Sequence, residues 1–296
     1  MSAWTRKGDW LELPLPRPGW QPLAPQAAEE LAGLLPVPGK LYWRLASSGG
    51  VRTSGGKLLL RLFAAEEPQF APEYNGGSEL DILYEDEFCL VVNKPAGMSV
   101  HPAERGQHGT LAGAVAWHYA ATGQACAVRH IHRLDKDTTG AVLYAKNEWA
   151  HVLLDEAMQH KRIDRRYCAV VAGAPAARQG TVRAPIGRDR HHAGKRRVSP
   201  GGDAAVTHYK VREQLRGAAW IELRLETGRT HQIRVHMSHL GHPLLGDVLY
   251  GGAPLFPRQA LHGERLLFAH PVERIPIDVH APLPEEMSRL LDKLRA

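Results

Sequence analysis

The residues best suited to chemistry gather in one short stretch, 130–140, with the sequence His-Ile-His-Arg-Leu-Asp-Lys-Asp-Thr-Thr-Gly. Most of these side chains are polar or charged, and an apolar run typical of a core strand follows at 141–145. Folded proteins commonly present functional groups on such a loop beside a core strand. Three interpretations of Asp135 follow: it is a catalytic carboxylate, a metal ligand, or a cap for the neighbouring helices and strands.

A metal site is one interpretation of this loop, because His130, His132 and Asp135 are residue types that bind cations. Arg133 and Lys136 would repel a cation, however, and the chain offers no cysteine or acidic cluster as an evident source of further ligands. Taken singly, each of these residues more commonly has a structural role in a loop. We therefore expect no metal here.

Positive charge is concentrated in one part of the chain. The formal net charge is +6 over 296 residues, yet residues 161–200 alone hold eleven lysines and arginines against two acidic residues. Such a segment repels itself unless a polyanion supplies counter-charge, and arginine-rich loops commonly contact phosphates. We expect nucleic acid to bind here, through Lys195, Arg196 and Arg197 among others, with a solvated loop as the alternative. Charge does not distinguish DNA from RNA.

The composition is that of an ordinary globular protein, with 44% hydrophobic and 23% charged residues. The first residues lack the apolar region of an export signal, and no stretch reaches the ~20 apolar residues that a membrane helix needs. Cys89, Cys126 and Cys168 are widely spaced, which fits core thiols better than a disulfide framework or a zinc motif. These features predict a cytoplasmic protein with no membrane contact.

Hydrophobic patterning beyond residue 75 predicts a mixed α/β (α+β) domain with a largely antiparallel central sheet. Apolar and charged residues alternate at 221–225, as expected for a half-buried strand. Thr110 and Asn147 are well placed to cap helices, because each precedes a run of residues with helical apolar spacing. The expected strands lie at 90–93, 141–145, 206–211 and 221–225.

The first 74 residues predict a separate small module. A short helix is expected at 26–35, and a turn at 50–56 leads into a strand at 57–63. Proline, glycine and serine in the link 67–78 suggest a boundary near Tyr74. We therefore divide the chain into residues 1–74 and 75–296.

Residues 132–143, His-Arg-Leu-Asp-x-x-Thr-Thr-Gly-x-x-Leu, closely resemble the central motif of the RluA-type pseudouridine synthases. Three further blocks, in the same order, are similar to motifs of that family. They are 84–102, which turns at Lys-Pro-Ala-Gly; 166–173, which carries a tyrosine; and 225–251, which contains His-Gln-Ile-Arg and Gly-Asp-x-x-Tyr-Gly. Four ordered blocks are far more specific than one motif, and the chain is identified as a member of that family.

The resemblance implies that the chain converts uridine in RNA to pseudouridine. In that reaction the uracil leaves C1′ of the ribose, turns over and rejoins through carbon, with no cofactor, metal or external energy. Ribosomal RNA is the favoured partner and transfer RNA the alternative, and a monomer suits enzymes of this type. A rival interpretation is a catalytically silent RNA-binding or RNA-remodelling protein on the same fold.

The resemblance also assigns roles to individual residues. Asp135 matches the catalytic aspartate, which acts as a nucleophile or as a base and must be ionised in a dry pocket. Arg234 matches the cation that holds this carboxylate, and Tyr167 matches the tyrosine that lies against the target uracil. Arg133 matches an arginine that fills the gap left when the nucleotide leaves its helix, which it must do before a side chain can reach C1′.

Many members of the family carry an N-terminal S4 RNA-binding module, and residues 1–74 are similar to it in element order. Gly50-Val51-Arg52 resembles part of the S4 loop. The basic helix of that module is poorly represented, since Arg44 is nearly isolated. We therefore interpret residues 1–74 as a degenerate S4-like module.

His101, His130, His132 and Lys94 are expected to shape loops or contact backbone.

Overall fold

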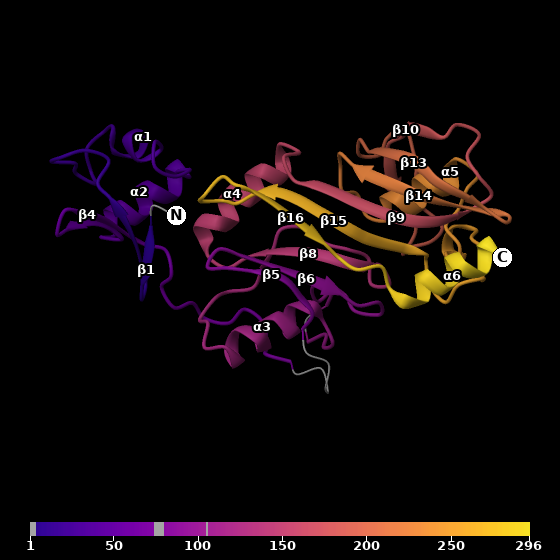
Figure 1. Cartoon of the computed structure of the whole chain (residues 1–296), viewed down its shortest axis with the longest axis horizontal. Coiled ribbons are helices and arrows are strands. Elements are labelled where there is room, and N and C mark those ends of the chain that lie inside the picture. The colour runs from indigo at the N-terminus through magenta and orange to yellow at the C-terminus, as the bar shows by residue number, and fades with distance from the viewer. Residues whose placement is uncertain (1–3, 74–79, 105) are drawn as a thin grey trace.

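The computed structural model describes residues 4–73, 80–104 and 106–296. A small N-terminal module lies at one end of a larger body that is built around a long twisted sheet (Figure 1). The predicted boundary near Tyr74 lies outside the described residues. The larger body has the expected mixed α/β architecture.

The N-terminal module is an antiparallel sheet with the strand order β1-β2-β4-β3 and two helices between β2 and β3. The turn predicted at 50–56 is confined to Gly55 and Gly56, because residues 51–54 form β3, which pairs with β4. The helix predicted at 26–35 is shorter, and a second helix follows Pro38. Gly33 and Pro36 interrupt helical continuity between the two. The elements are β1 (Thr5–Lys7), β2 (Trp10–Pro14), α1 (Ala27–Leu31), α2 (Gly39–Ser47), β3 (Val51–Ser54) and β4 (Lys57–Arg61).

The module packs on one end of the large sheet through aromatic side chains. Phe88 is fully buried there, with ring centroids 5.3 Å from Trp4 and 5.5 Å from Phe63. The indole of Trp149 donates a hydrogen bond to the carbonyl of Pro36 at 3.1 Å. One hydrophobic cluster therefore spans the module and the adjoining end of the larger body.

The large sheet follows the order β10-β13-β14-β9-β15-β8-β6-β5, with β16 added on β15 and β7 on β8. Neighbouring strands run antiparallel except where β15 meets β8, which confirms the predicted largely antiparallel sheet. The strands are β5 (Ile82–Glu85), β6 (Cys89–Lys94), β7 (Arg129–His130), β8 (Thr139–Ala145), β9 (Asp164–Ala172), β10 (Gln179–Arg183), β13 (Val206–Leu215), β14 (Ala218–Leu225), β15 (Leu261–Ala269) and β16 (Pro276–His280).

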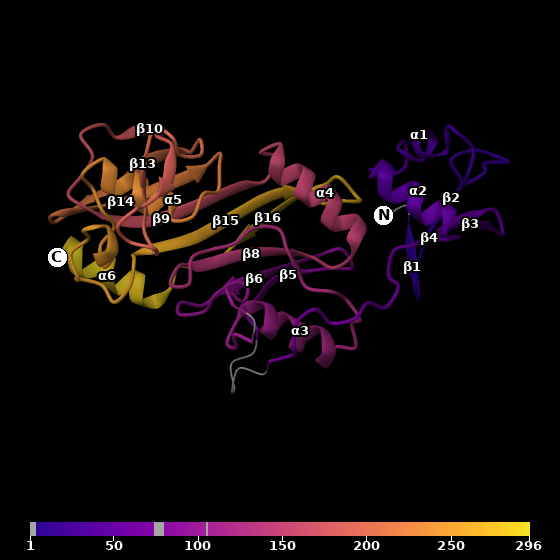
Figure 2. The same cartoon turned by 180° about the vertical axis from the view of Figure 1, so that it is seen from behind.

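Helices cover the sheet at several places, and both predicted caps are present. The Thr110 hydroxyl accepts a hydrogen bond from the Gly113 amide at 3.2 Å, and the Asn147 side chain accepts one from Ala150 at 2.9 Å. α5 packs beside β13 (Figure 2). The remaining elements are α3 (Leu111–Ala121), α4 (Glu148–Gln159), α5 (Gln232–His239), α6 (Glu285–Arg295), the 3₁₀ turn η1 (Val248–Tyr250), and a hairpin of β11 (Ile186–Arg188) and β12 (Arg196–Val198).

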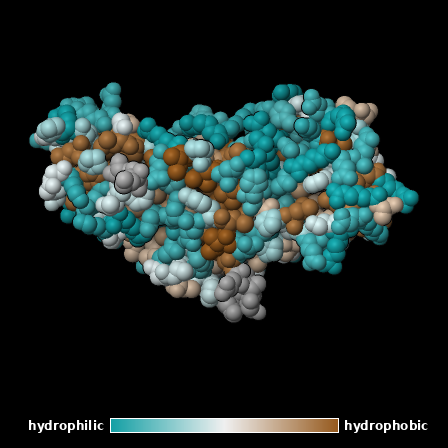
Figure 3. Space-filling view, in the orientation of Figure 1, coloured by the Kyte–Doolittle hydropathy of each residue, from teal (hydrophilic) through white to brown (hydrophobic). Residues whose placement is uncertain are grey.

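Hydrophilic residues cover most of the face seen in Figure 3, and hydrophobic residues gather over the N-terminal module and the middle of the molecule. Within the described part of the chain, no helix combines the length and apolar character required to cross a membrane.

Cys89 and Cys168 are buried, Cys126 is half-buried, and all three are free thiols, as the sequence predicts.

Buried polar contacts anchor the loop between β7 and β8, which carries Asp135. Lys94 is fully buried, and its ammonium donates hydrogen bonds to the carbonyls of Pro95, Met98 and Lys136 at 2.7 to 2.8 Å. Arg258 donates to the carbonyl of Asp137 at 3.1 Å. The carbonyl oxygens of this loop have no partner in a helix or sheet, and these side chains supply their hydrogen bonds. Lys94 therefore contacts backbone, as expected from the sequence.

Gly140 sets how closely the end of this loop approaches the neighbouring strand. It has φ +120°, and a Cβ atom placed on it would lie 2.2 Å from the carbonyl oxygen of Gly263 on β15. Residues 140 and 263 are partners in the parallel pairing of β8 and β15. Only glycine permits this backbone contact and this φ together.

Replacing Gly140 with alanine should therefore destabilise the protein by roughly 2–4 kcal/mol, because it adds backbone strain to a steric clash. Gly217, in the turn between β13 and β14, is the matched control: it has φ +65° with open space around the position of a Cβ atom. Gly217→Ala should cost about 1 kcal/mol. Urea denaturation measures both, and equal losses would contradict the proposed contact.

Candidate active site

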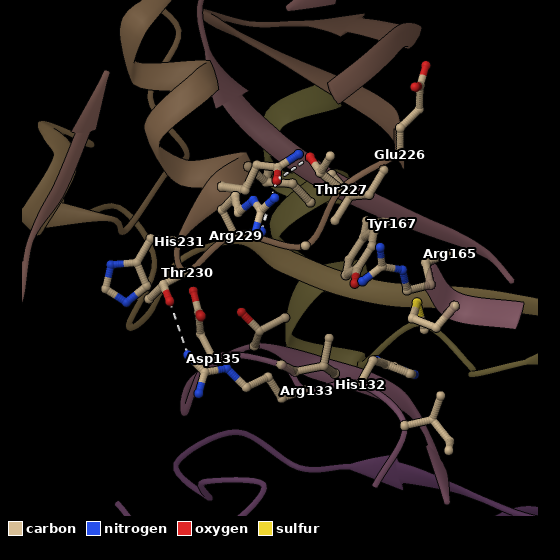
Figure 4. A pocket seen from close by; sticks show the side chains of 18 of the residues that line it. His132, Arg133, Asp135, Arg165, Tyr167, Glu226, Thr227, Arg229, Thr230 and His231 are labelled. Atoms are coloured by element: carbon tan, nitrogen blue, oxygen red, sulfur yellow. Dashed lines mark hydrogen bonds between the residues drawn. The ribbon is translucent and has the colours of Figure 1, made fainter. Parts of the chain in front are cut away.

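A cleft of about 730 Å³ opens beside the loop that carries Asp135 (Figure 4). Its walls are formed by the loop 130–135, the C-terminal part of α4, the start of β9 and the segment 225–234 that joins β14 to α5. These segments are far apart in the chain and meet because β9 lies between β14 and β15. The cleft thus collects three of the four blocks of the sequence motif.

Asp135 and Arg234 face each other in this cleft. The Nη1 atom of Arg234 lies 3.3 Å from Oδ2 of Asp135, and the exposed fractions of their side chains are 10% and 24%. Arg234 lies on α5, in the first turn of the helix. The structure therefore brings together the carboxylate and the guanidinium that the sequence motif predicts as partners.

Asp247 fixes the orientation of that guanidinium. Its two carboxylate oxygens accept hydrogen bonds from Nε and Nη2 of Arg234 at 2.7 and 2.8 Å, and its side chain is 1% exposed. Burial lowers the pKa of Arg234, but the hydrogen bonds and charges of Asp247 and Asp135 outweigh it and raise that pKa above its ordinary value. Arg234 is therefore a permanent cation with one donor, Nη1, directed at Asp135.

Tyr167 lies across the cleft on β9. Tyr167 is 5% exposed, and no described residue forms a hydrogen bond with its hydroxyl. Burial raises the pKa of this phenol, while Arg165 opposes the rise and Asp135 adds to it. The hydroxyl is thus protonated at neutral pH and available to a molecule in the cleft.

Arg133 is exposed at the mouth of the cleft, two residues before Asp135. Its Nη2 atom donates a hydrogen bond to the Thr230 hydroxyl at 3.0 Å (Figure 4). This contact links the loop 130–135 to the segment 225–234. Arg133 is therefore held at the exposed rim of the cleft.

Lys195, Arg196 and Arg197 lie on the β11–β12 hairpin and do not line the cleft. The hairpin touches the site indirectly, through Tyr250. The hydroxyl of Tyr250 accepts a hydrogen bond from the Arg196 amide at 2.9 Å, and the ammonium of Lys195 lies 5.5 Å from the centre of its ring. The guanidinium carbon of Arg234 is 5.0 Å from the same ring. The hairpin and Arg234 thus share Tyr250 as a common contact.

His130 and His132 do not form a metal site with Asp135. Burial lowers the pKa of His132 to about 3, and its Nε2 atom accepts a hydrogen bond from the Leu143 amide at 3.3 Å. The ring of His130 is stacked on His101, with centroids 4.9 Å apart. Their ligand atoms do not come within 4.8 Å of one another together with Asp135, among the residues that the structure describes.

A different trio, Asp86, Cys89 and His270, does bring its ligand atoms within 4.8 Å. Its geometry is already explained by hydrogen bonds. Asp86 accepts from His270 Nε2 at 2.9 Å, and the Nδ1 atom of His270 accepts from the Glu273 amide at 2.9 Å. Both nitrogens of the ring are therefore engaged, and burial raises the pKa of Cys89, so this trio does not fit a cation.

The comparison with known proteins places this geometry in a family. Residues 88–239 match the sequence profile of the RNA pseudouridylate synthases. The chain is 49% identical, over 242 residues, to the uncharacterised RNA pseudouridine synthase YhcT of Bacillus subtilis (strain 168), a match that covers 80% of this chain and 78% of that protein. This chain belongs to the RNA pseudouridine synthase family. It is therefore an isomerase that acts on RNA, of the RluA type that the motifs indicate.

Other relatives agree with this assignment. The synthase is 40% identical over 257 residues to a protein of Escherichia coli (strain K12) named ribosomal large subunit pseudouridine synthase D, with 82% of this chain and 78% of that protein covered. Its fold is similar to that of the human RNA pseudouridylate synthase domain containing 4, with a TM-score of 0.60 and 26% identity over 73% of this chain and 93% of that one. The predicted mixed α/β synthase fold with a largely antiparallel sheet is thereby confirmed.

Several residues of the site had no role assigned from the sequence of this synthase. Asp247 and Tyr250 belong to the block Gly-Asp-x-x-Tyr-Gly, so the sequence motif contains both residues. The motif does not show which residues they contact. His231 precedes α5 with φ +58°, and its Nδ1 atom lies 2.8 Å from the Tyr250 hydroxyl. Arg165 lines the cleft next to Tyr167, and nothing in its local sequence distinguishes it from other arginines nearby.

Replacing Asp247 with asparagine should lower the free energy of unfolding by about 3 kcal/mol, because Arg234 then loses one carboxylate of a buried ion pair. Asp278→Asn is the control, since Asp278 pairs with Arg265 on the surface and its loss should matter far less. Urea denaturation of both variants checks the prediction. Similar small losses in the two variants would show that Asp247 is not needed to hold Arg234.

Proposed function

We propose that this synthase isomerises specific uridines of structured ribosomal RNA to pseudouridine, with Asp135 as the essential carboxylate and no cofactor. The observation that carries the proposal is the Asp135–Arg234 ion pair, 3.3 Å long, at the edge of a cleft that also contains Tyr167. Isomerisation exchanges no electrons with an outside partner, so the proposed chemistry calls for no redox cofactor.

Asp135 is proposed to act on the nucleoside directly, as a nucleophile or as a base. A buried carboxylate loses the solvation that favours its charged form, and an adjacent cation restores that preference. Arg234 is this cation, because Asp247 holds its guanidinium in place while Nη1 reaches Asp135. The ion pair therefore places a fixed positive charge beside the Asp135 carboxylate, at the site where C1′ must arrive.

Tyr167 and Arg133 are proposed to bind the extruded nucleotide. A base stacked on an aromatic ring gains about 1–3 kcal/mol, which restrains a uracil that has left its ribose. Tyr167 offers such a ring from the wall of the cleft, opposite the loop of Asp135. Arg133 lies at the exposed rim, where its planar guanidinium is suited to occupy the position that the nucleotide vacates and so to offset the loss of stacking.

Ribosomal RNA is the proposed substrate because relatives with 40% and 44% identity are named ribosomal large subunit pseudouridine synthase D. We infer that the synthase acts in the cytoplasm as a monomer.

The N-terminal module, which contains β1 to β4 and the helices α1 and α2, is proposed to be S4-like and to guide the choice of RNA. Transfer RNA remains the alternative substrate, to be distinguished by mapping pseudouridine across total RNA from cells with and without this chain.

The Asp135→Asn variant should lose pseudouridine formation by a factor on the order of 10⁴, because the carboxylate participates in bond breaking. RNA affinity should stay within a few-fold of the native value, since the carboxamide keeps the shape of the side chain. Release of tritium from [5-³H]uridine-labelled RNA measures the reaction, and filter binding measures the affinity.

Asp137→Asn is a matched control, because Asp137 belongs to the same loop but does not line the cleft. This variant should isomerise uridine at close to the native rate. Comparable activity of native protein and the Asp135 variant would refute the essential role of Asp135. Pseudouridine sites restricted to transfer RNA would refute the choice of ribosomal RNA alone.

Replacing Lys195, Arg196 and Arg197 together with alanine should weaken RNA binding and reduce its dependence on salt. If these side chains contact about two or three phosphates, the slope of log affinity against log salt concentration should become shallower by roughly 2. Filter binding between low and moderate salt gives the slope. The folded state should remain intact, which circular dichroism verifies.

The control removes two basic residues of α6, Arg289 and Lys293, whose helix does not line the cleft. That variant should keep the native slope. An unchanged slope after the replacement of residues 195–197 would exclude them as a phosphate-binding surface.

A further inference from the structure

Arg165 is a buried arginine with no partner among the residues that the structure describes. It is 8% exposed, its Nε atom is enclosed, and no hydrogen bond or ion pair to its guanidinium is formed within that part of the chain. The other arginines that are similarly buried have carboxylate partners: Asp247 pairs with Arg234 and Glu286 pairs with Arg258. A buried charge without a counter-charge is costly, so the absence of a protein partner here points to a ligand.

The guanidinium of Arg165 faces the cleft. Arg165 and Tyr167 are two residues apart on β9, so their side chains lie on the same face of the strand, and both line the cleft. Figure 4 shows the two side chains together, on the wall opposite Arg133 and Asp135. Arg166, between them, faces the other side of the sheet and pairs with Asp164 at 3.0 Å.

The backbone of the segment 225–234 closes over this guanidinium. A Cβ atom placed on Gly228 would lie 2.8 Å from Nη1 of Arg165, so the absence of a side chain at Gly228 makes room for the cation. The contact leaves Arg165 on the enclosed wall, whereas Arg133 is exposed at the rim. A bulky hydrated phosphate suits the rim, and a flat base with two carbonyl oxygens suits the enclosed wall.

We propose that Arg165 is a further catalytic residue, whose guanidinium binds a carbonyl oxygen of the extruded uracil and stabilises the anion formed when uracil leaves C1′. The inference rests on the proposed function of the cleft. When the C1′–N1 bond breaks, its electron pair stays with uracil and spreads over N1, O2 and O4. The C1′–C5 bond then forms, C5 loses its proton and N1 gains one. A fixed cation at O2 or O4 acts on the charged species more strongly than on neutral uracil.

The test compares Arg165→Met and Arg165→Lys with native protein in single-turnover reactions with excess enzyme. The probe is total RNA labelled with [5-³H]uridine, from cells that lack this chain, and the readouts are the limiting rate and the half-saturating enzyme concentration. Arg165→Met should lower the limiting rate about 10²–10³-fold, as expected when one donor to a developing anion is lost. Arg165→Lys should recover part of that rate because it keeps the charge.

Two further readouts separate this role from others. The half-saturating enzyme concentration and its salt dependence should change little in Arg165→Met, whereas a phosphate contact would reduce the salt slope by about 1. Thermal stability should be equal or higher, because methionine replaces an unpaired buried charge. Arg166→Met, on the opposite face of β9, should keep the native limiting rate.

An unchanged limiting rate in Arg165→Met would overturn the inference, as would a shallower salt slope with a native rate, or a loss of stability that accounts for the loss of rate. If native protein released no tritium from any RNA, the proposed function would fail and the inference with it. If native protein released tritium and Arg165→Met matched it, only the inference would fail.

Discussion

The guanidinium of Arg234 forms ion pairs with two carboxylates, those of Asp247 and Asp135, and the rest of the site depends on this shared cation. Asp247 is buried and needs a cation, so it holds Nε and Nη2 of Arg234 in a fixed plane. That constraint leaves Nη1 to face Asp135, which is partly exposed to the cleft. The buried pair thus provides a rigid positive charge, and the carboxylate of Asp135 faces the cleft while keeping its counter-ion.

The fold brings this pair together from segments that are distant in the sequence. The loop of Asp135 is fixed by the ammonium of Lys94 and by the backbone contact between Gly140 and Gly263. α5 carries Arg234 to the cleft, and β9 presents Tyr167 from the centre of the large sheet. Preorganised groups of this kind need little rearrangement when a nucleotide arrives. The same strand presents Arg165, whose charge has no protein partner among the described residues.

Local patterns in the sequence were sufficient to predict much of the frame. Alternation at 221–225 marks β14, and the capping residues Thr110 and Asn147 mark the starts of α3 and α4, because these signals depend on near neighbours only. The helix that carries Arg234 and the pairing with Asp247 depend on packing between distant segments, which no local pattern encodes. The motif named the residues of the site, but only the assembled sheet shows which of them share one cleft.

The most direct test of this account is a crystal structure of the Asp135→Asn variant bound to the RNA segment that the synthase modifies. The account predicts that the target uridine lies outside its helix, with its base against Tyr167 and its C1′ within about 3.5 Å of the side chain at position 135. A target nucleotide that remains stacked in its helix, or a uracil bound away from this cleft, would contradict it.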